Sequence, residues 1–308
     1  MANTAEPVIT GRASETLADA EIPGGTVVGR SNFYHASRRF FRQKLAVAGL
    51  VVTLLLIGTA VFAPVIAPTS YKTADLMEAN QKPNSEHWFG TDAIGHDYLS
   101  RVIYGIRTSL IVAFSAVAVA CLIGIPLGLA AGLRGGWIDF IVSRVVEVMT
   151  AFPGLLFAIF LVSLYGSGMR NIIIVIGATS WVGLCRLTRA QVLVLREQEY
   201  VTAIRAVGAS EMRVGLRHLL PNAFPPLIIT ITFAVPLAIF AEAGLSFLGI
   251  GINEPLPSLG KMIGENSSAT IRVYWHLAFF PTIAIALTML GFSFVGDGLR
   301  DALDPRQN

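Results

Sequence analysis

The sequence predicts an all-α membrane protein with six transmembrane helices. Of its 308 residues, 54% are hydrophobic and only 14% are charged, and the mean hydropathy is +0.64. This chain is far more apolar than a soluble domain requires. Six apolar segments each have about the 20 residues that a helix needs to cross a hydrocarbon core. They are residues 45–67, 109–133, 140–165, 171–190, 225–250 and 277–296.

The positions of Lys and Arg orient these segments, because loops on the cytoplasmic side of a membrane carry an excess of basic residues. One basic group precedes the first segment, and a second runs from the end of the fourth segment towards the fifth. The two groups are Arg38, Arg39, Arg42 and Lys44, then Arg186, Arg189, Arg196, Arg205, Arg213 and Arg217. We expect both groups in the cytoplasm, and six segments then place both termini there as well. This pattern also explains the pI of about 9.0 without nucleic acid as a partner.

The chain ahead of the first segment divides into two parts. Residues 1–31 are a polar mixture with no apolar stretch, so we expect a disordered cytoplasmic tail rather than a signal peptide. In residues 31–44 aromatic side chains mix with Arg, which favours a helix lying at the membrane surface. A plain juxtamembrane linker is the alternative.

No group of residues in the sequence indicates catalysis, a metal site or a cofactor. Cys121 and Cys185 both fall inside apolar segments, where we expect them to pack as small apolar side chains. The five histidines are scattered and form no H-E-x-x-H pair. The chain also lacks a G-x-x-x-x-G-K-[ST] phosphate loop. A process driven by ATP would therefore need a separate nucleotide-binding chain.

The most informative polar stretch, EYVTAIRAVGASEMRVGLRHLLP at 199–221, lies between the fourth and fifth apolar segments. A short helical pattern over 200–207 is interrupted by Gly208, and Ser210 is suited to cap a second helix with Glu211 in its first turn. The pattern therefore predicts a helix, a glycine turn and a second helix.

The second helix of this insert has two different faces. The apolar face comprises Met212, Leu216 and Leu219 or Leu220. The other face carries Arg213 and Arg217, four residues apart. We expect one face to dock and the other to remain in water. On periodicity alone, an ordinary cytoplasmic loop with a surface helix is the alternative.

A second informative stretch, 87–110, follows the first apolar segment. Its glycines and aspartates predict consecutive turns, in which the carboxylates cap a helix or accept hydrogen bonds from the backbone. These residues are Gly90, Asp92, Gly95 and Asp97. From Tyr98 onward the pattern is helical, so we expect a compact folded loop that leads into a helix.

Two carboxylates inside the apolar segments need an explanation, because an ionisable group at membrane depth is costly. Arg144 lies three residues before Glu147, so an ion pair along one helix face accounts for that carboxylate. Glu242 has no basic residue in its own segment, which makes it the stronger candidate for lining or gating a pathway. An interhelical hydrogen bond is the alternative for Glu242. We retain both residues as candidate pathway residues.

Glycines and prolines within the apolar segments predict where helices pack closely and where they bend. Gly124, Gly128 and Gly132 recur every four residues, which predicts a seam of close helix packing within the chain or against a partner. Prolines in other segments are expected to kink their helices. These prolines are Pro153, Pro236 and Pro281.

The insert resembles the cytoplasmic signature of permease subunits of binding-protein-dependent ABC importers. In that signature an E-A-A triplet, a following Gly and a distal I-x-L-P form the helix that couples to the ATPase. The matching residues here are Ala203, Gly208, Leu220 and Pro221. Thr202, Ile204 and His218 replace the usual Glu, second Ala and Ile. The resemblance implies ATPase coupling through Thr202, Ala203, Ile204, Gly208, Arg213, Arg217, Leu220 and Pro221.

Three other stretches, 87–110, 242–260 and 296–305, resemble the oligopeptide and dipeptide importer permeases, and most closely the C-type permease. His96 stands where that family usually has Arg, and Leu259 where a Trp is common. The resemblance implies a juxtamembrane segment, first transmembrane helix and extracytoplasmic loop over 32–108. It further implies a five-helix permease core over 109–308, with a cytoplasmic coupling-helix insert at about 191–224.

The resemblance also implies the partners: two ATP-binding subunits, a homologous second permease subunit, an extracytoplasmic substrate-binding protein and the lipid bilayer. The expected location is the cell membrane of a prokaryote, and the expected cargo is peptide. Related permeases also serve glutathione or nickel, which remain alternatives. A stand-alone secondary transporter would show an internal repeat, and a membrane enzyme would show clustered His, Asp or Ser; we find neither convincingly.

Overall fold

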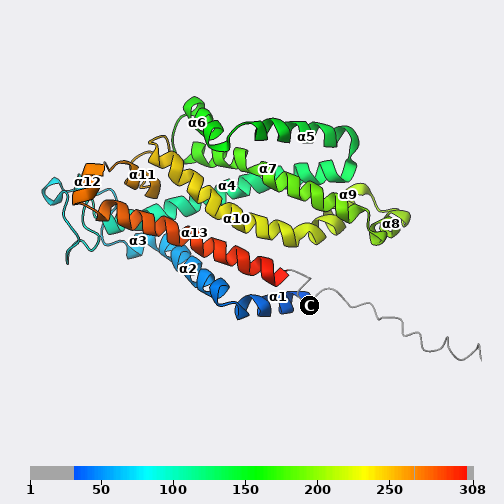
Figure 1. Ribbon diagram of the computed structural model, residues 1–308, viewed down its shortest axis with the longest axis horizontal. Helices are drawn as coiled ribbons and strands as arrows, with labels where there is room; N and C mark the ends of the chain where they lie inside the picture. Colours follow the sequence, from blue (N-terminus) through cyan, green and yellow to red (C-terminus); the bar gives the residue numbers. More distant parts are fainter. Residues whose placement is uncertain (1–30, 267, 304–308) are drawn as a thin grey trace, which may run out of the picture.

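The computed structural model describes residues 31–266 and 268–303 of the chain (Figure 1). Within those ranges every regular element is a helix, and one isolated bridge pairs Thr91 with Asp97. The helices in chain order are α1 Ser31–Arg42, α2 Lys44–Val61, α3 Ala63–Ile66, the 3-10 helix η1 Leu76–Glu78, α4 Tyr98–Arg134, α5 Gly136–Ala151, α6 Gly154–Tyr165, α7 Met169–Arg196, α8 Glu199–Ala206, α9 Glu211–Arg213, the π-helix η2 Val214–Leu219, α10 Leu220–Phe247, α11 Leu259–Gly264, α12 Ser268–Val273 and α13 His276–Leu303.

Five helices are long and apolar enough to cross a membrane, and a bent pair provides a sixth if it counts as one span. The five are α2, α4, α7, the continuous helix Glu211–Phe247 and α13. The segment predicted at 140–165 is broken at Pro153, where a kink was expected, and α5 and α6 meet at 90°. Pro153 lacks a backbone N–H, and it favours an extended conformation for Phe152, whose ψ is 135°. The helix therefore ends at this point. By contrast, Pro236 and Pro281 lie inside unbroken helices.

The predicted glycine seam is present within this chain, where α4 packs along α7. A Cβ added to Gly124 would lie 2.6 Å from the carbonyl oxygen of Trp181, and one added to Gly132 would lie 2.8 Å from Val192. Gly128 lies just as close to the backbone of Cys185, which is itself buried in the seam. Small residues thus bring the two helix backbones together, which is how membrane helices gain packing energy without a hydrophobic driving force.

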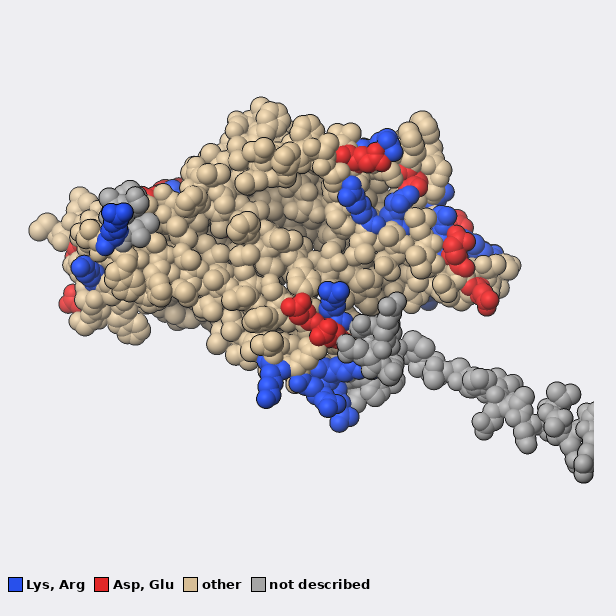
Figure 2. All heavy atoms as spheres, viewed as in Figure 1, with Lys and Arg blue, Asp and Glu red and all other residues tan. Residues whose placement is uncertain are grey.

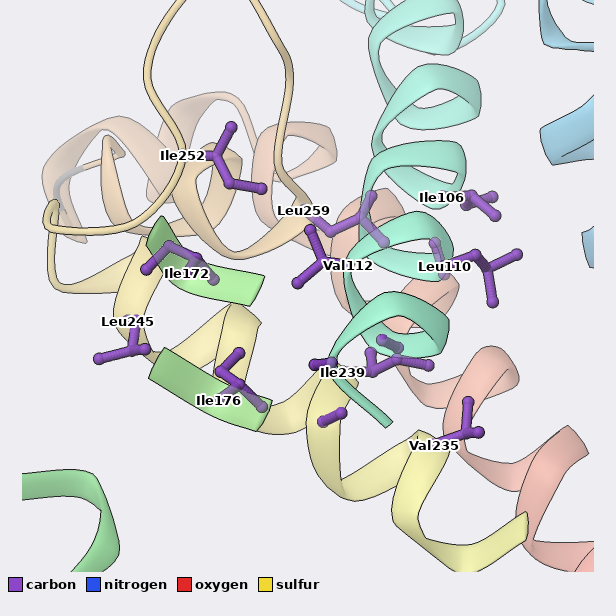
Figure 3. Close-up of a cluster of buried hydrophobic side chains, with 14 of the residues drawn as sticks. Ile106, Leu110, Val112, Ile172, Ile176, Val235, Ile239, Leu245, Ile252 and Leu259 are labelled. Atoms are coloured by element: carbon purple, nitrogen blue, oxygen red, sulfur yellow. The ribbon is translucent and has the colours of Figure 1, made fainter. Parts of the chain in front are cut away.

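The main core lies where α4, α7 and α10 meet, and α13 and the α11 region cover it (Figure 3). Aliphatic side chains from these elements point towards one another in that view. They include Ile106, Leu110 and Val112 from α4, Ile172 and Ile176 from α7, Val235, Ile239 and Leu245 from α10, and Ile252 and Leu259 beyond it. This core holds α10 against α4 and α7 along much of its length.

The two ends of the helix bundle differ (Figure 1). One end carries α1, α8, α9 and the last turn of α13, and the other carries α3, α12 and the loop that contains η1. Phe40 of α1 packs with Ala46 and Ala302, so the beginning and the end of the described chain lie together. The predicted helix ahead of the first span is confirmed as α1. The predicted tail lies outside the described residues except for Ser31, which begins α1.

Candidate functional site

The polar insert forms the predicted helix, glycine turn and helix. The amide of Gly208 donates to the carbonyl of Arg205 at 2.9 Å, and the amide of Ala209 donates to the carbonyl of Ile204 at 3.3 Å. Gly208 has a φ of +89°, a conformation that side chains bearing a Cβ rarely adopt. A Cβ at this position would meet no atom within 4 Å. The turn therefore requires glycine for its backbone conformation and not for lack of space.

An ion pair closes this turn, and it was not predicted from the sequence. Both Nε and Nη2 of Arg205 donate to the two carboxylate oxygens of Glu211, at 3.0 and 3.1 Å. The pair joins the last turn of α8 to the first turn of α9 across Gly208. Both side chains are partly exposed, so the pair contributes mainly to geometry and only modestly to stability. The opposite charges six residues apart are visible in the sequence, but only the turn brings them together.

The insert is fastened to two long helices by apolar side chains. Val201 of α8 and Val214 and Leu219 of η2 are fully buried. They pack with Leu129 near the end of α4 and Val192 near the end of α7. These contacts attach the insert to α4 and α7.

The second helix of the insert differs from the prediction in its register. Met212 and Leu216 are 57% and 52% exposed whereas Leu219 is buried, so the predicted apolar face does not pack as one surface within this chain. The π-helix η2 separates Leu219 from the face of Met212, because its hydrogen bonds from residue i to i+5 widen the turn and shift the side chains that follow. The side chain of Ser210 forms no capping hydrogen bond, although Ser210 does occupy the N-cap position.

A shallow hollow of about 420 Å3 lies at the tip of the insert. It is lined by Ala203, Ile204, Val207, Gly208, Ala209, Arg213 and His218. Val207 is 90% exposed beside it. Figure 2 shows basic and acidic side chains close together at this end of the molecule. An exposed apolar side chain within a charged rim is the arrangement that a protein partner recognises.

The eight predicted coupling residues do not all share this hollow. Ala203, Ile204, Gly208 and Arg213 line it. Thr202 is exposed on α8 but is not among the residues that line the hollow. Arg217, Leu220 and Pro221 lie further along η2 and the start of α10.

Glu242 lies at the centre of a fully buried polar cluster, with no exposed surface. Its Oε2 accepts from Ser109 of α4 at 2.7 Å, and its Oε1 accepts from Ser246 of α10 and from Ser258 at 2.8 Å each. Ser258 also caps α11 by accepting from the amide of Lys261. The alternative of an interhelical hydrogen bond is therefore realised. We call Glu242 and these three serines the Glu242 cluster.

Glu147 has the ion pair predicted for it. Nη1 of Arg144 lies 2.7 Å from Oε2 of Glu147, and each side chain is about half exposed. The carboxylate also borders a hollow of about 280 Å3 between α5 and α7, where Arg186 and Arg189 project. Of the two candidate pathway residues, Glu147 thus borders open space and Glu242 does not.

The loop ahead of α4 is compact, as predicted. Asp97 caps α4 by accepting from the amide of Ser100 at 2.8 Å, and Asp92 accepts from the amide of His96 at 2.9 Å. The buried Arg101 donates to Asp92 at 2.9 Å. Arg101 also donates to Glu254 at 3.3 Å, which ties the loop to the segment after α10. Burial alone would raise the pKa of Glu254, but the nearby Lys261 and Arg101 hold it below its usual value.

His87 joins three parts of the same loop. Its Nδ1 lies 2.9 Å from Asp97 and its Nε2 lies 3.2 Å from Glu78. The hydrogen bond to Asp97 raises the pKa of His87 above its usual value despite the opposing effect of burial.

Comparison with known proteins identifies the family. Residues 124–308 match the family described as the binding-protein-dependent transport system inner membrane component. Residues 31–83 match the N-terminal TM domain of oligopeptide transport permease C. The chain belongs to the binding-protein-dependent inner-membrane transport family.

Several curated relatives of this transport family cover most of the chain. The dipeptide transport system permease protein DppC of Bacillus subtilis is 44% identical over 88% of this chain and 85% of its own length. The oligopeptide transport system permease protein OppC of the same organism is 42% identical over 88% of each chain. The glutathione transport system permease protein GsiD of Pectobacterium atrosepticum is 40% identical over 87% of this chain and 89% of its own length.

A solved structure shows the same fold. It describes inward-facing conformations of the MetNI methionine ABC transporter, with a TM-score of 0.54 and 19% identity. The match covers 67% of this chain and 98% of the other. The chain is thus a multi-pass membrane protein with the fold of an ABC transporter permease, and it is a transport subunit of an inner-membrane system.

Proposed function

We propose that this chain is the C-type permease subunit of an ATP-driven importer of oligopeptides or dipeptides. The observation that carries the proposal is the insert, whose exposed tip is fastened to α4, α7 and α10 through a buried apolar anchor. Relatives named as dipeptide and oligopeptide permeases support the choice of cargo. Because one relative is named a glutathione permease, import of glutathione is the second candidate. Nickel, the other alternative cargo, rests on the family resemblance alone.

In this proposal the tip of the insert binds an ATP-binding subunit, and the chain itself performs no chemistry. Closure of two such subunits on ATP pushes the insert, and Val201, Val214 and Leu219 pass the movement to the long helices. A homologous second permease completes the pathway, and an extracytoplasmic binding protein delivers the cargo. The end with α1 and the insert then faces the cytoplasm, with both termini, and the compact loop faces the opposite side.

The same proposal divides the chain as the sequence suggested. Residues 1–31 form a cytoplasmic tail, and 32–108 form the juxtamembrane segment, first span and extracytoplasmic loop. Residues 109–308 form the permease core, with the insert at about 191–224. The tight seam between α4 and α7 supports a core that moves as a unit.

The test is purification of the chain from its native membrane in mild detergent, followed by mass spectrometry of the proteins that accompany it. We expect two nucleotide-binding chains with phosphate-loop motifs and a second permease. The complex is then reconstituted into liposomes with its binding protein, and uptake of a dipeptide, an oligopeptide and glutathione is measured with and without ATP. Uptake of peptides only with ATP supports the proposal. A lone chain that transports without these partners would overturn it.

A further inference from the structure

The hollow of about 280 Å3 between α5 and α7 is lined mainly by polar side chains, and we call it the α5–α7 hollow. Four of its lining residues have polar side chains, Ser143 and Glu147 from α5 and Arg186 and Arg189 from α7. The two helices run alongside each other here (Figure 1). Neither the insert nor the Glu242 cluster contributes a residue to this hollow, so it is a separate feature of the fold.

One face of α5 is polar where it meets the hollow. Four polar residues recur at intervals of three or four along the helix, which places them on one face. They are Asp139, Ser143, Glu147 and Thr150. The opposite face is apolar, with Ile141 46% and Val148 60% exposed. The helix therefore presents polar groups towards α7 and apolar groups to its surroundings.

The α5–α7 hollow lies within the span rather than at its end. Glu147 is 11 positions beyond Gly136, where α5 begins, and this corresponds to roughly 16 Å along the helix, about half of a hydrocarbon core. On α7 the backbone of Cys185 touches Gly128, which lies inside α4, and Arg186 is the next residue. Ionisable side chains at such a depth are costly unless they meet a partner or water. The charged lining therefore indicates a hydrated space.

Two of the three arginines around the hollow are neutralised within the chain. Asp139 accepts hydrogen bonds from Nε and Nη2 of Arg189. Nη1 of Arg144 lies 2.7 Å from Oε2 of Glu147. Both acidic side chains on this face of α5 are therefore already paired with an arginine.

The third arginine, Arg186, is exposed and forms no ion pair within the described residues. Its Nη2 donates to the hydroxyl of Thr150 at 3.1 Å, which orients the guanidinium but uses only one of its five N–H donors. A planar guanidinium with free donors binds a carboxylate through two parallel hydrogen bonds. The hollow thus offers one positioned cation for a carboxylate.

We propose that Arg186 binds the terminal carboxylate of the cargo as the cargo crosses the span. This inference rests on the proposed function, because peptides and glutathione both carry a free carboxylate. The volume of about 280 Å3 is slightly smaller than that of sites that enclose a whole small molecule, roughly 300–1,000 Å3. The hollow therefore accommodates one end of a peptide. Such a site serves peptides of different length and sequence, because the carboxylate is common to all of them.

The test measures access to a cysteine placed in the hollow. Ser143→Cys is made in a chain that also carries Cys121→Ala and Cys185→Ala, and the full chain is purified with the proteins that accompany it. Its reaction with N-ethylmaleimide is followed by mass spectrometry at increasing concentrations of dialanine or of dialanine amide. Only dialanine carries a carboxylate. The concentration that halves the reaction rate should therefore be roughly tenfold lower, or less, for dialanine than for the amide, as expected for hydrogen bonds between charged groups.

Arg186→Gln should abolish the difference between the two peptides. Arg186→Lys should retain part of it, because the charge remains without the planar geometry. The matched control Arg170→Gln, at an exposed position in the first turn of α7, should behave as the wild type. Equal protection by both peptides, including none, would overturn the inference, as would a difference that persists in Arg186→Gln.

A cysteine that does not react in the purified complex would also overturn the inference, and would assign the hollow to contact with another chain, such as the proposed second permease. None of these measurements involves transport. The uptake assay decides the proposed function separately, so a failure of this inference is distinguishable from a failure of that function.

Discussion

In both the insert and the Glu242 cluster, polar residues interrupt an otherwise apolar chain. The cluster buries its polar groups and hydrogen-bonds them within the chain, whereas the insert leaves its polar groups exposed. In the Glu242 cluster three serine hydroxyls from different segments donate to one carboxylate with no exposed surface. The insert buries only its apolar anchor and leaves Thr202, Arg213 and Val207 exposed.

The Glu242 cluster joins elements of this chain to one another, whereas the tip of the insert is exposed and open to another molecule. A buried carboxylate that is hydrogen-bonded to several elements rigidifies its neighbours. An anchored element with an exposed apolar tip is suited to bind a partner and to transmit its movement.

The largest effect is expected from Glu242→Leu. The substitution leaves three buried hydroxyls without their acceptor, at about 1–3 kcal/mol for an unsatisfied buried group. Thermal unfolding of the purified protein in detergent should show a clear decrease in melting temperature. Glu242→Gln keeps the shape of the side chain and should lower the melting temperature less. It should still impair uptake more than Glu147→Gln, because the half-exposed ion pair of Glu147 contributes only roughly 0–1 kcal/mol. Equal tolerance of Glu242→Leu and Glu147→Gln would remove the structural role from Glu242.

Gly208→Val should uncouple transport from ATP hydrolysis. The positive φ costs a residue with a Cβ about 1–2 kcal/mol, which corresponds to a roughly 5- to 30-fold smaller population of the formed turn. Uptake driven by ATP should fall accordingly, while the amount of protein in the membrane stays constant. The control is Gly183→Val, at an exposed helical glycine that also has open space around it. Wild-type uptake by Gly208→Val would contradict a coupling role for the turn.

The ion pair across the turn should have a smaller effect. A double-mutant cycle with Arg205→Gln and Glu211→Gln should give a coupling energy of roughly 0.2–1 kcal/mol, because both side chains are partly exposed. The charge swap Arg205→Glu/Glu211→Arg should restore part of the uptake lost in either single swap. Additive single effects would show that the pair does not hold the two helices together.

The smallest effect concerns pH and the compact loop. Because its folded pKa is raised, His87 contributes stability that is fully present below its unfolded pKa of about 6.5 and is lost as the pH rises through the folded value. Amide hydrogen exchange of residues 67–97 should therefore accelerate more between pH 6 and 8 than the intrinsic chemistry alone predicts. The variant His87→Gln should remove the additional acceleration. The same pH profile in both proteins would show that protonation of His87 does not stabilise the loop.

Local features were predictable because they depend on near neighbours in the chain. The cap by Asp97, the ion pair of Arg144 with Glu147 and the turn at Gly208 all join residues within a few positions of one another. Other features required the folded chain. The π-helical register, which exposes Leu216, depends on how η2 packs against α4 and α7.

The helical membrane class, the position of the insert and the seam of small residues follow from the sequence alone, because apolar length and residue size act locally. The surroundings of Glu242 and Glu147 depend on the packed helices. Ser109 lies 133 residues from Glu242 and Ser258 lies 16 residues from it, so no periodicity in the chain reveals that they converge on one carboxylate. An isolated carboxylate in an apolar segment suggested a pathway residue, whereas the folded chain shows it hydrogen-bonded to three serines with no exposed surface. Burial and hydrogen-bond partners are properties of the packed helices, and only packing brings distant segments within 3 Å.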